Sequence, residues 1–186
     1  MAKWDEIAAG DVEVTGGTGV AAKKAGGKIE AGEIISKYDD VVKYKFNAVS
    51  NPGPLATMKG KPAANFFGGR YSIEVLAEDR IYYRVGAKDR PLGQWFTKEP
   101  VKSVAQARID LAIKEQWVNP VTGELDGTSI LDSIYKVKIP KGTIVYEGPI
   151  GCQEGVYMGG MNFAQTFIPE PWKISGVEVI GQIPLK

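Results

Sequence analysis

The 186-residue chain contains no histidine, and its single cysteine is Cys152. Without histidine, the Ser-His-Asp and Cys-His catalytic arrangements and His-ligated zinc sites are excluded. One cysteine allows neither an internal disulfide nor a cysteine metal cluster, so no metal site is expected. Because free cysteine is usually buried, we expect Cys152 to be a small packing residue.

An excess of charge and a long apolar run are also lacking. Lysine and arginine total 23 against 22 acidic residues, which gives a net charge of +1. Proteins that bind nucleic acid through bulk charge are strongly basic, so nucleic acid is not expected as a partner. No apolar run approaches the roughly 20 residues of a spanning helix, and the N-terminal segment has no signal-peptide pattern, so no membrane span is expected.

The composition changes along the chain. Residues 10–32 are rich in glycine, alanine and charge, which is typical of a linker or mobile arm. The apolar spacing of residues 33–50 suits an amphipathic helix, or a helix followed by a strand, and the Pro and Gly residues of 51–54 then interrupt the pattern. We therefore predict a linker or N-terminal helical extension over 1–50 and one folded domain over 51–186.

Short strand patterns dominate the predicted domain. Strands are expected at 81–86, 135–139, 143–147 and 176–186, and the second of these alternates apolar residues with Lys136 and Lys138. A helix is expected from Ser103, since Ser103 and Gln106 have capping-box spacing. Its apolar face is expected to carry Ala105, Ile109, Ala112 and Ile113. The helix is expected to end near Trp117. This pattern predicts an α+β fold of two small packed β-sheets with one or two helices.

Three strand-like segments each carry a polar residue that a core does not need. Arg84 lies in 81–86, Thr97 ends 92–97, and Gln165 lies in 157–168. An arginine fork can hold phosphate or ribose oxygens, and an amide can both donate and accept hydrogen bonds. The alternative for Arg84 and Gln165 is a solvated strand position.

Aromatic and glycine residues flank these three positions. Trp95 and Phe96 offer flat rings for stacking a ligand, although aromatic residues also favour strands for packing reasons alone. Gly159 and Gly160 suit either a hairpin turn or a loop where the backbone approaches a ligand closely.

The order of Tyr83-Arg84, Phe96-Thr97 and Gln165 resembles the ADP-ribosyltransferase-like toxin superfamily. It is most similar to the NAD-degrading C-terminal toxin domains of bacterial polymorphic toxins, the tuberculosis necrotizing toxin type. There, a first strand carries an arginine after an aromatic residue, a second an aromatic-hydroxyl step, and a later one Glu or Gln. The resemblance covers roughly residues 51–186 and implies an ADP-ribosyltransferase-like core.

The resemblance implies a secreted effector that acts in the target-cell cytoplasm, either in interbacterial competition or against a host cell. Its activity would be hydrolysis of NAD⁺ or NADP⁺ to nicotinamide and ADP-ribose (phosphate), with the dinucleotide as substrate, no further cofactor, and a monomeric enzyme. The catalytic residues would be Arg84, Thr97 and Gln165. The substrate-binding residues would be Tyr83, Trp95, Phe96, Gly159 and Gly160.

Two other functions remain open at this point. A protein ADP-ribosyltransferase on the same fold would need a glutamate such as Glu154 or Glu170, whereas Thr166 follows Gln165 directly, which favours hydrolysis. A non-enzymatic binding module would use Arg84 and the aromatic residues as a partner patch.

A toxin of this kind implies a cognate immunity protein as partner. We expect that protein to contact the loops 153–155 and 88–90. An acidic inhibitor would suit Lys88, Arg90 and Lys98, because complementary charge speeds association.

Overall fold

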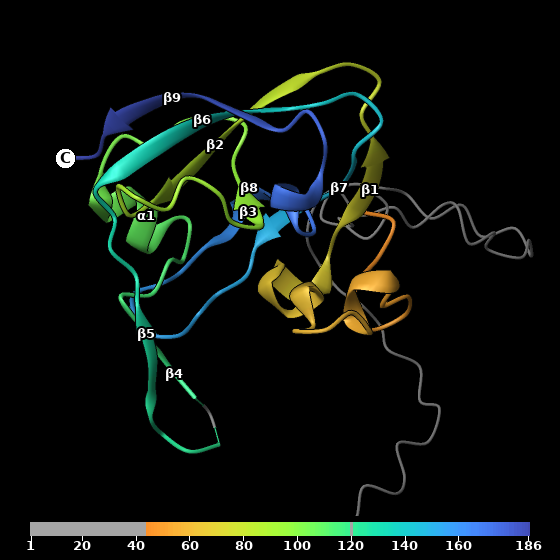
Figure 1. Cartoon of the computed structure of the whole chain (residues 1–186). Helices are drawn as coiled ribbons and strands as arrows, with labels where there is room; N and C mark the ends of the chain where they lie inside the picture. Colours follow the sequence, from red (N-terminus) through yellow and green to blue (C-terminus); the bar gives the residue numbers. More distant parts are fainter. Residues whose placement is uncertain (1–43, 120) are drawn as a thin grey trace, which may run out of the picture. The chain divides into compact units, whose positions relative to one another are not determined.

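Two antiparallel sheets face each other in the computed structural model, which describes residues 44–119 and 121–186 (Figure 1). One sheet has the strand order β1-β7-β8-β3, the other has the order β2-β6-β9, and β4 and β5 form a separate hairpin. The strands are β1 Ser72–Val75, β2 Arg80–Gly86, β3 Trp95–Phe96, β4 Gln116–Val118, β5 Leu125–Thr128, β6 Ser133–Ile139, β7 Ile144–Ile150, β8 Gly160–Phe167 and β9 Glu178–Pro184. The α+β prediction is confirmed.

The helical elements of the described residues are short. They are the α-helix α1, Val104–Ile109, and the 3₁₀ helices η1 Pro54–Ala56, η2 Pro62–Asn65, η3 Phe67–Gly69 and η4 Pro171–Lys173. Within the described residues, no helix is long and apolar enough to cross a membrane.

The predicted linker or helical extension over 1–50 lies mostly outside the described residues. Its last residues, however, are described, and Phe46 forms a β-bridge with Tyr71. The Phe46 ring stacks on the Tyr71 ring at 4.8 Å between centroids, so this part of the chain packs against the domain.

The two larger sheets share a core. Its fully buried members include Tyr82 of β2, Phe96 of β3, Val137 of β6 and Val145 of β7. A β-bridge between Tyr83 and Thr97 adds a direct backbone link between β2 and β3, with both N–H···O distances at 2.8 Å. The first two strands of the predicted site are therefore held side by side.

Strand β6 follows its predicted alternation. Tyr135, Val137 and Ile139 are buried, whereas Lys136 is exposed and Lys138 half-buried. The turn at 140–142 does not make a hairpin with β7, because β6 and β7 belong to different sheets. The chain therefore crosses from one sheet to the other at this turn.

The helix α1 begins as predicted but is shorter and turned differently. The Ser103 side chain accepts a hydrogen bond from the Gln106 N–H at 3.1 Å, which confirms the cap. The helix ends at Ile109, and Ala112 has a left-handed φ of 51°. The predicted apolar face was wrong for Ala105 and Ile109, which are exposed, whereas Ala112 is buried and Ile113 packs against the core beyond the end of the helix. Ala107 is the residue that α1 buries against the β6 and C-terminal side chains.

The prediction that Cys152 packs in the interior was also wrong. Cys152 is exposed, in the loop that follows β7. The loop is held instead by polar contacts on either side of it, from the Gly151 N–H and the Gln153 side chain to Asn65.

Candidate functional site

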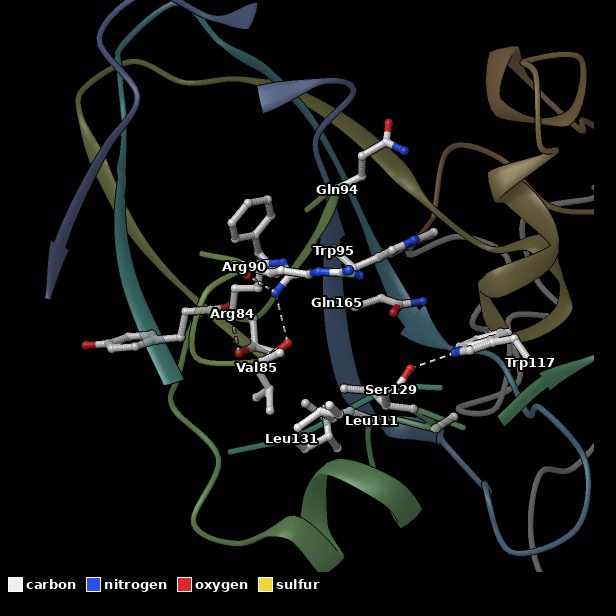
Figure 2. Close-up of a pocket in the computed structure, with 18 of the residues that line it drawn as sticks. Arg84, Val85, Arg90, Gln94, Trp95, Leu111, Trp117, Ser129, Leu131 and Gln165 are labelled. Atoms are coloured by element: carbon white, nitrogen blue, oxygen red, sulfur yellow. Dashed lines mark hydrogen bonds between the residues drawn. The ribbon is translucent and has the colours of Figure 1, made fainter. Parts of the chain in front are cut away.

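A cavity of about 800 Å³ opens between the two sheets and the β4–β5 hairpin (Figure 2). Volumes of this size are typical of small-molecule sites. The cavity is lined by six of the eight residues expected from the sequence to form a site: Tyr83, Arg84, Trp95, Phe96, Thr97 and Gln165. Strand residues far apart in the chain thus contribute to a single pocket.

Arg84 is half-buried on β2 and opens into this cavity. Its Nη1 donates to the carbonyl oxygens of Arg90, at 3.0 Å, and Val85, at 3.3 Å. Within the described residues, no carboxylate pairs with Arg84, and Nε and Nη2 bond no protein acceptor. Burial lowers the pKa of this guanidinium, which nevertheless stays charged at neutral pH. Such a group, charged and half-desolvated, is suited to hold an anion.

Two glycines fix the position of the guanidinium. A Cβ built on Gly93 would lie 2.8 Å from Cζ of Arg84, and one built on Gly86 would lie 3.3 Å from the same atom. These distances are shorter than normal side-chain contacts, so any larger residue at either position would displace the guanidinium. The sequence analysis did not identify these glycines as part of the site.

The turn that accepts the Arg84 hydrogen bond is itself anchored. The Tyr135 hydroxyl bonds the carbonyl oxygen of Ala87, at 2.8 Å, and that of Lys88. The Arg90 N–H donates to the Ala87 carbonyl at 2.9 Å. Because Tyr135 lies opposite Arg84 in the β2–β6 pairing, one strand pair positions both the guanidinium and the turn that it binds.

Gln165, on β8, is oriented by a backbone carbonyl. Its Nε2 donates to Asn65 O at 2.6 Å, and the Gly151 N–H donates to the same oxygen at 2.7 Å. Gln153 Nε2 donates to Asn65 Oδ1 at 2.8 Å. The bond from Gln165 uses one of the two Nε2 hydrogens and fixes the amide plane, and Oε1 is left to accept a hydrogen bond from a ligand hydroxyl or a water molecule.

Asn65 and Gln153 line the cavity, and sequence reasoning missed both as site residues. Asn65 ends a 3₁₀ turn, and Gln153 lies in a loop, so neither occurs in a strand pattern that would mark it. Only the fold brings them to Gln165.

The two aromatic residues before Thr97 lie in different places, Phe96 in the core and Trp95 at the cavity. Phe96 is 2% exposed and packs near Tyr82 in the core, so it supports the cavity from behind. Trp95 is less buried, and its ring lies 4.8 Å from the Phe167 ring and 5.4 Å from the Phe66 ring. Trp95 is therefore the member of the pair that can present a ring edge or face to a ligand.

The Thr97 hydroxyl has a fixed direction. It donates to the carbonyl of Glu99 at 2.6 Å and lies 3.4 Å from the carbonyl of Tyr83. With its proton committed to the backbone, the Thr97 oxygen can only accept a hydrogen bond from a ligand.

Gly159 and Gly160 are placed outside the lining of the cavity. Gly159 has a φ of 55°, and its N–H donates to the Ile109 carbonyl at 2.9 Å. A Cβ there would lie 2.6 Å from the Ile150 carbonyl oxygen. A close backbone approach accounts for glycine at position 159 without a ligand.

The acidic residues that line the cavity are Asp89 and Asp132. Glu154 and Glu170, the glutamates that a transferase would need, do not line it, and Glu170 pairs with Lys173 at 2.6 Å.

The wall formed by the hairpin was not anticipated from the sequence. Trp117 of β4 lines the cavity, and its Nε1 donates to Ser129 Oγ at 2.7 Å. Trp117 was expected to close a helix, but the chain leaves the helix earlier and forms the β4–β5 pair, in which Trp117 lies opposite Gly127.

Comparison with known proteins gives a weak likeness. No protein-family model matches the sequence, and no curated protein does. One chain of the structure of Tne2 in complex with Tni2 superposes with a TM-score of 0.48 at 19% identity, over 64% of this chain and 97% of that one. One chain of the structure of Tse6 in complex with Tsi6 superposes with a TM-score of 0.41 at 15% identity, over 63% and 77%. TM-scores below 0.5 at these identities say nothing of activity.

Proposed function

We propose that residues 51–186 form a bacterial toxin domain with an ADP-ribosyltransferase-like core that hydrolyses NAD⁺ or NADP⁺. The observation that carries this proposal is Arg84, a half-buried guanidinium with Nε and Nη2 free to donate and no carboxylate partner among the described residues, in a cavity large enough for a dinucleotide. A pyrophosphate supplies the negative charge that this group lacks.

The remaining polar groups suit the nicotinamide half of the substrate. Gln165 Oε1 accepts a hydrogen bond from a ribose hydroxyl or from the attacking water. Thr97 Oγ1 accepts one from the carboxamide N–H₂ group, and Trp95 lies against the nicotinamide ring. These roles match the direction in which each group is held, because one N–H of Gln165 and the proton of Thr97 are already bound to the backbone.

Hydrolysis at such a site needs no strong acid or base. The bond between ribose C1′ and the pyridinium nitrogen breaks with both electrons going to nitrogen, so nicotinamide leaves as a neutral molecule. Water then adds its oxygen to C1′ and releases one proton to solvent, giving ADP-ribose. The protein holds the dinucleotide, limits access of bulk water and stabilises the cationic ribose electrostatically, which is compatible with a chain that has no histidine.

The absence of Glu154 and Glu170 from the lining of the cavity favours hydrolysis over protein modification. A transferase must activate a side chain of its target, and neither Glu154 nor Glu170 lines the cavity. Incubation with NAD⁺ labelled in its adenylate part and a target-cell lysate separates the two reactions. Hydrolysis predicts free labelled ADP-ribose only, whereas label on a protein band would support transfer.

A toxin that consumes NAD⁺ requires an immunity protein in its producer, because the dinucleotide is common to both cells. Of the loops expected to contact it, Lys88, Asp89, Arg90 and Gln153 line the cavity, so a protein seated there would cover the substrate. Lys98 bonds Glu147 at 2.6 Å, which leaves Lys88 and Arg90 as the cations that would attract an acidic inhibitor. Expression without that partner is expected to arrest growth and lower cellular NAD⁺.

A further inference from the structure

The wall of the cavity formed by the β4–β5 hairpin has no role in the chemistry described above. Figure 2 shows Trp117 and Arg84 at opposite sides of the pocket, with Gln165 between them in the view. Trp117 is 38% exposed and lines the cavity, so part of this residue is available to a ligand. A dinucleotide whose pyrophosphate binds Arg84 has two arms, and Trp95 and Gln165 hold only one of them.

The Trp117 ring is held in place within its hairpin. Its Nε1 donates to Ser129 Oγ across the strand pair at 2.7 Å, and Lys114 Nζ lies 5.9 Å from the ring centroid. With its only polar atom satisfied, the indole presents an apolar surface at the cavity. The ring is therefore suited to stack a flat ligand group, and Ser129 retains its hydroxyl proton for donation.

The base of the hairpin is fastened to the domain by Arg108 of α1. Nη1 of this residue donates to the carbonyls of Ile113, at 3.1 Å, and Lys114, at 2.8 Å, and Nη2 donates to that of Ser129 at 2.6 Å. A second fastening is the hydrogen bond from the Glu115 N–H to the Tyr157 hydroxyl at 3.1 Å. The stacking surface is thus preorganised, which lowers the cost of ordering it on binding.

We propose, as a consequence that rests on the proposed function, that Trp117 and Ser129 form the adenine subsite of the dinucleotide. The Lys114 ammonium beside the indole disfavours the cationic nicotinamide ring there, whereas adenine is neutral. Adenine also has ring nitrogens that can accept a hydrogen bond from the Ser129 hydroxyl. The nicotinamide ring has no such nitrogen, because its ring nitrogen is bonded to ribose, and only its carboxamide could accept. The two aromatic residues therefore divide the substrate, with nicotinamide at Trp95 and adenine at Trp117.

The subsite is tested by calorimetric titration of the full chain with AMP, ADP-ribose and nicotinamide mononucleotide. In Trp117→Ala, binding of AMP and ADP-ribose is expected to weaken by about tenfold, the order of a lost base–aromatic stack. Trp117→Phe should keep most of the affinity. Nicotinamide mononucleotide, which lacks adenine, should bind the parent and both variants equally.

Trp172→Ala is the matched control, because Trp172 is 52% exposed and lies outside the lining of the cavity. It should bind all three ligands as the parent does. The subsite is overturned if the parent binds neither AMP nor ADP-ribose, if Trp117→Ala binds them as tightly as the parent, or if the loss extends to nicotinamide mononucleotide.

Kinetic measurements distinguish a failure of the adenine subsite from a failure of the proposed hydrolase function. In an active parent, Trp117→Ala should raise the KM for NAD⁺ by the same factor while leaving turnover of nicotinamide mononucleotide unchanged. A parent without NAD⁺ turnover that still needs Trp117 to bind ADP-ribose would overturn the hydrolase and support the subsite. A parent that hydrolyses NAD⁺ and keeps the same KM in Trp117→Ala would support the hydrolase and overturn the subsite.

Discussion

Gly93 packs against Arg84 so closely that a Cβ at position 93 would stand 2.8 Å from Cζ of the guanidinium. Gly93 is not one of the glycines with positive φ, so alanine can adopt its backbone without strain. We expect Gly93→Ala to displace the guanidinium and to lower kcat/KM for NAD⁺ by about a hundredfold, the order of a misplacement of about 1 Å. Steady-state kinetics measure the loss of kcat/KM, and a thermal unfolding curve shows separately whether the substitution changes stability.

The control for this substitution is Gly181→Ala. Gly181, in β9, also lacks a positive φ, and its nearest neighbour would be Lys136 Cβ at 3.6 Å, an ordinary contact. It should retain parental activity. Full activity in Gly93→Ala would show that the position of the Arg84 guanidinium does not matter for turnover.

Gln165 is expected to act through the orientation that Asn65 gives it. In Gln165→Glu, a carboxylate would face the Asn65 carbonyl oxygen now 2.6 Å from Nε2, so the side chain should turn away. The expected loss in kcat is roughly tenfold to a hundredfold, the range for a buried polar group that loses its hydrogen-bond partner. Gln182→Glu makes the same change at an amide outside the cavity, whose Nε2 donates to Ser133 Oγ at 3.0 Å, and should leave kcat unchanged. Equal kcat values in both variants would remove Gln165 from the mechanism.

The rate of hydrolysis should depend little on pH near neutrality. Burial lowers the pKa of Arg84, but a guanidinium remains charged there, and neither Thr97 nor Gln165 titrates. We expect kcat/KM for NAD⁺ to be flat from about pH 6 to about pH 9, where a histidine mechanism would show a limb. A bell-shaped profile would reveal an acid or base that this site does not include.

Stability should fall in alkali because of Tyr71 and Tyr82. Burial raises the pKa of both hydroxyls above the ordinary value of 10.0, so the folded chain keeps protons that the unfolded chain loses. The free energy of unfolding is therefore fully retained below about pH 10 and decreases as the pH rises through the folded pKa values. Urea unfolding at about pH 8 and about pH 10.5 measures the difference.

Tyr71→Phe tests this account of the alkaline range. The hydroxyl accepts from the Leu55 N–H at 3.0 Å and donates to the Pro52 carbonyl at 2.8 Å, so its removal should cost about 2 kcal/mol at pH 8. The same substitution should make stability less dependent on pH above about pH 10. An unchanged alkaline slope would show that Tyr71 ionises equally in the folded and unfolded states.

The strands were predictable because their side chains alternate. Tyr135, Val137 and Ile139 mark β6 through local period alone, and the polar residues Arg84 and Gln165 were noticeable because they interrupt apolar runs. The cap of α1 was equally local. The buried face of α1 was not, since the contact of Ala107 with the C-terminal segment depends on the whole fold.

The parts of the pocket that were missed are those made by distant segments. Asn65 reaches Gln165 across 100 residues of sequence, and the Gly93 contact with Arg84 exists only once the turn at 87–90 has folded back. Trp117 was expected to end a helix, because Ser129, which its Nε1 bonds, lies 12 residues away and is brought to it only by the hairpin. Sequence patterns identify which residues are unusual, whereas the fold determines which of them meet.

The most direct measurement of the central claim is the loss of NAD⁺ and the appearance of nicotinamide and ADP-ribose with purified full-length parent, Arg84→Ala and Arg80→Ala. Arg80 lies on the same strand, but it is paired with Glu74 at 2.6 Å and does not line the cavity. We predict turnover by the parent and by Arg80→Ala, and a loss of at least about a hundredfold in Arg84→Ala with its circular dichroism spectrum unchanged. No turnover by folded parent at micromolar enzyme, or equal turnover by Arg84→Ala, would contradict the account.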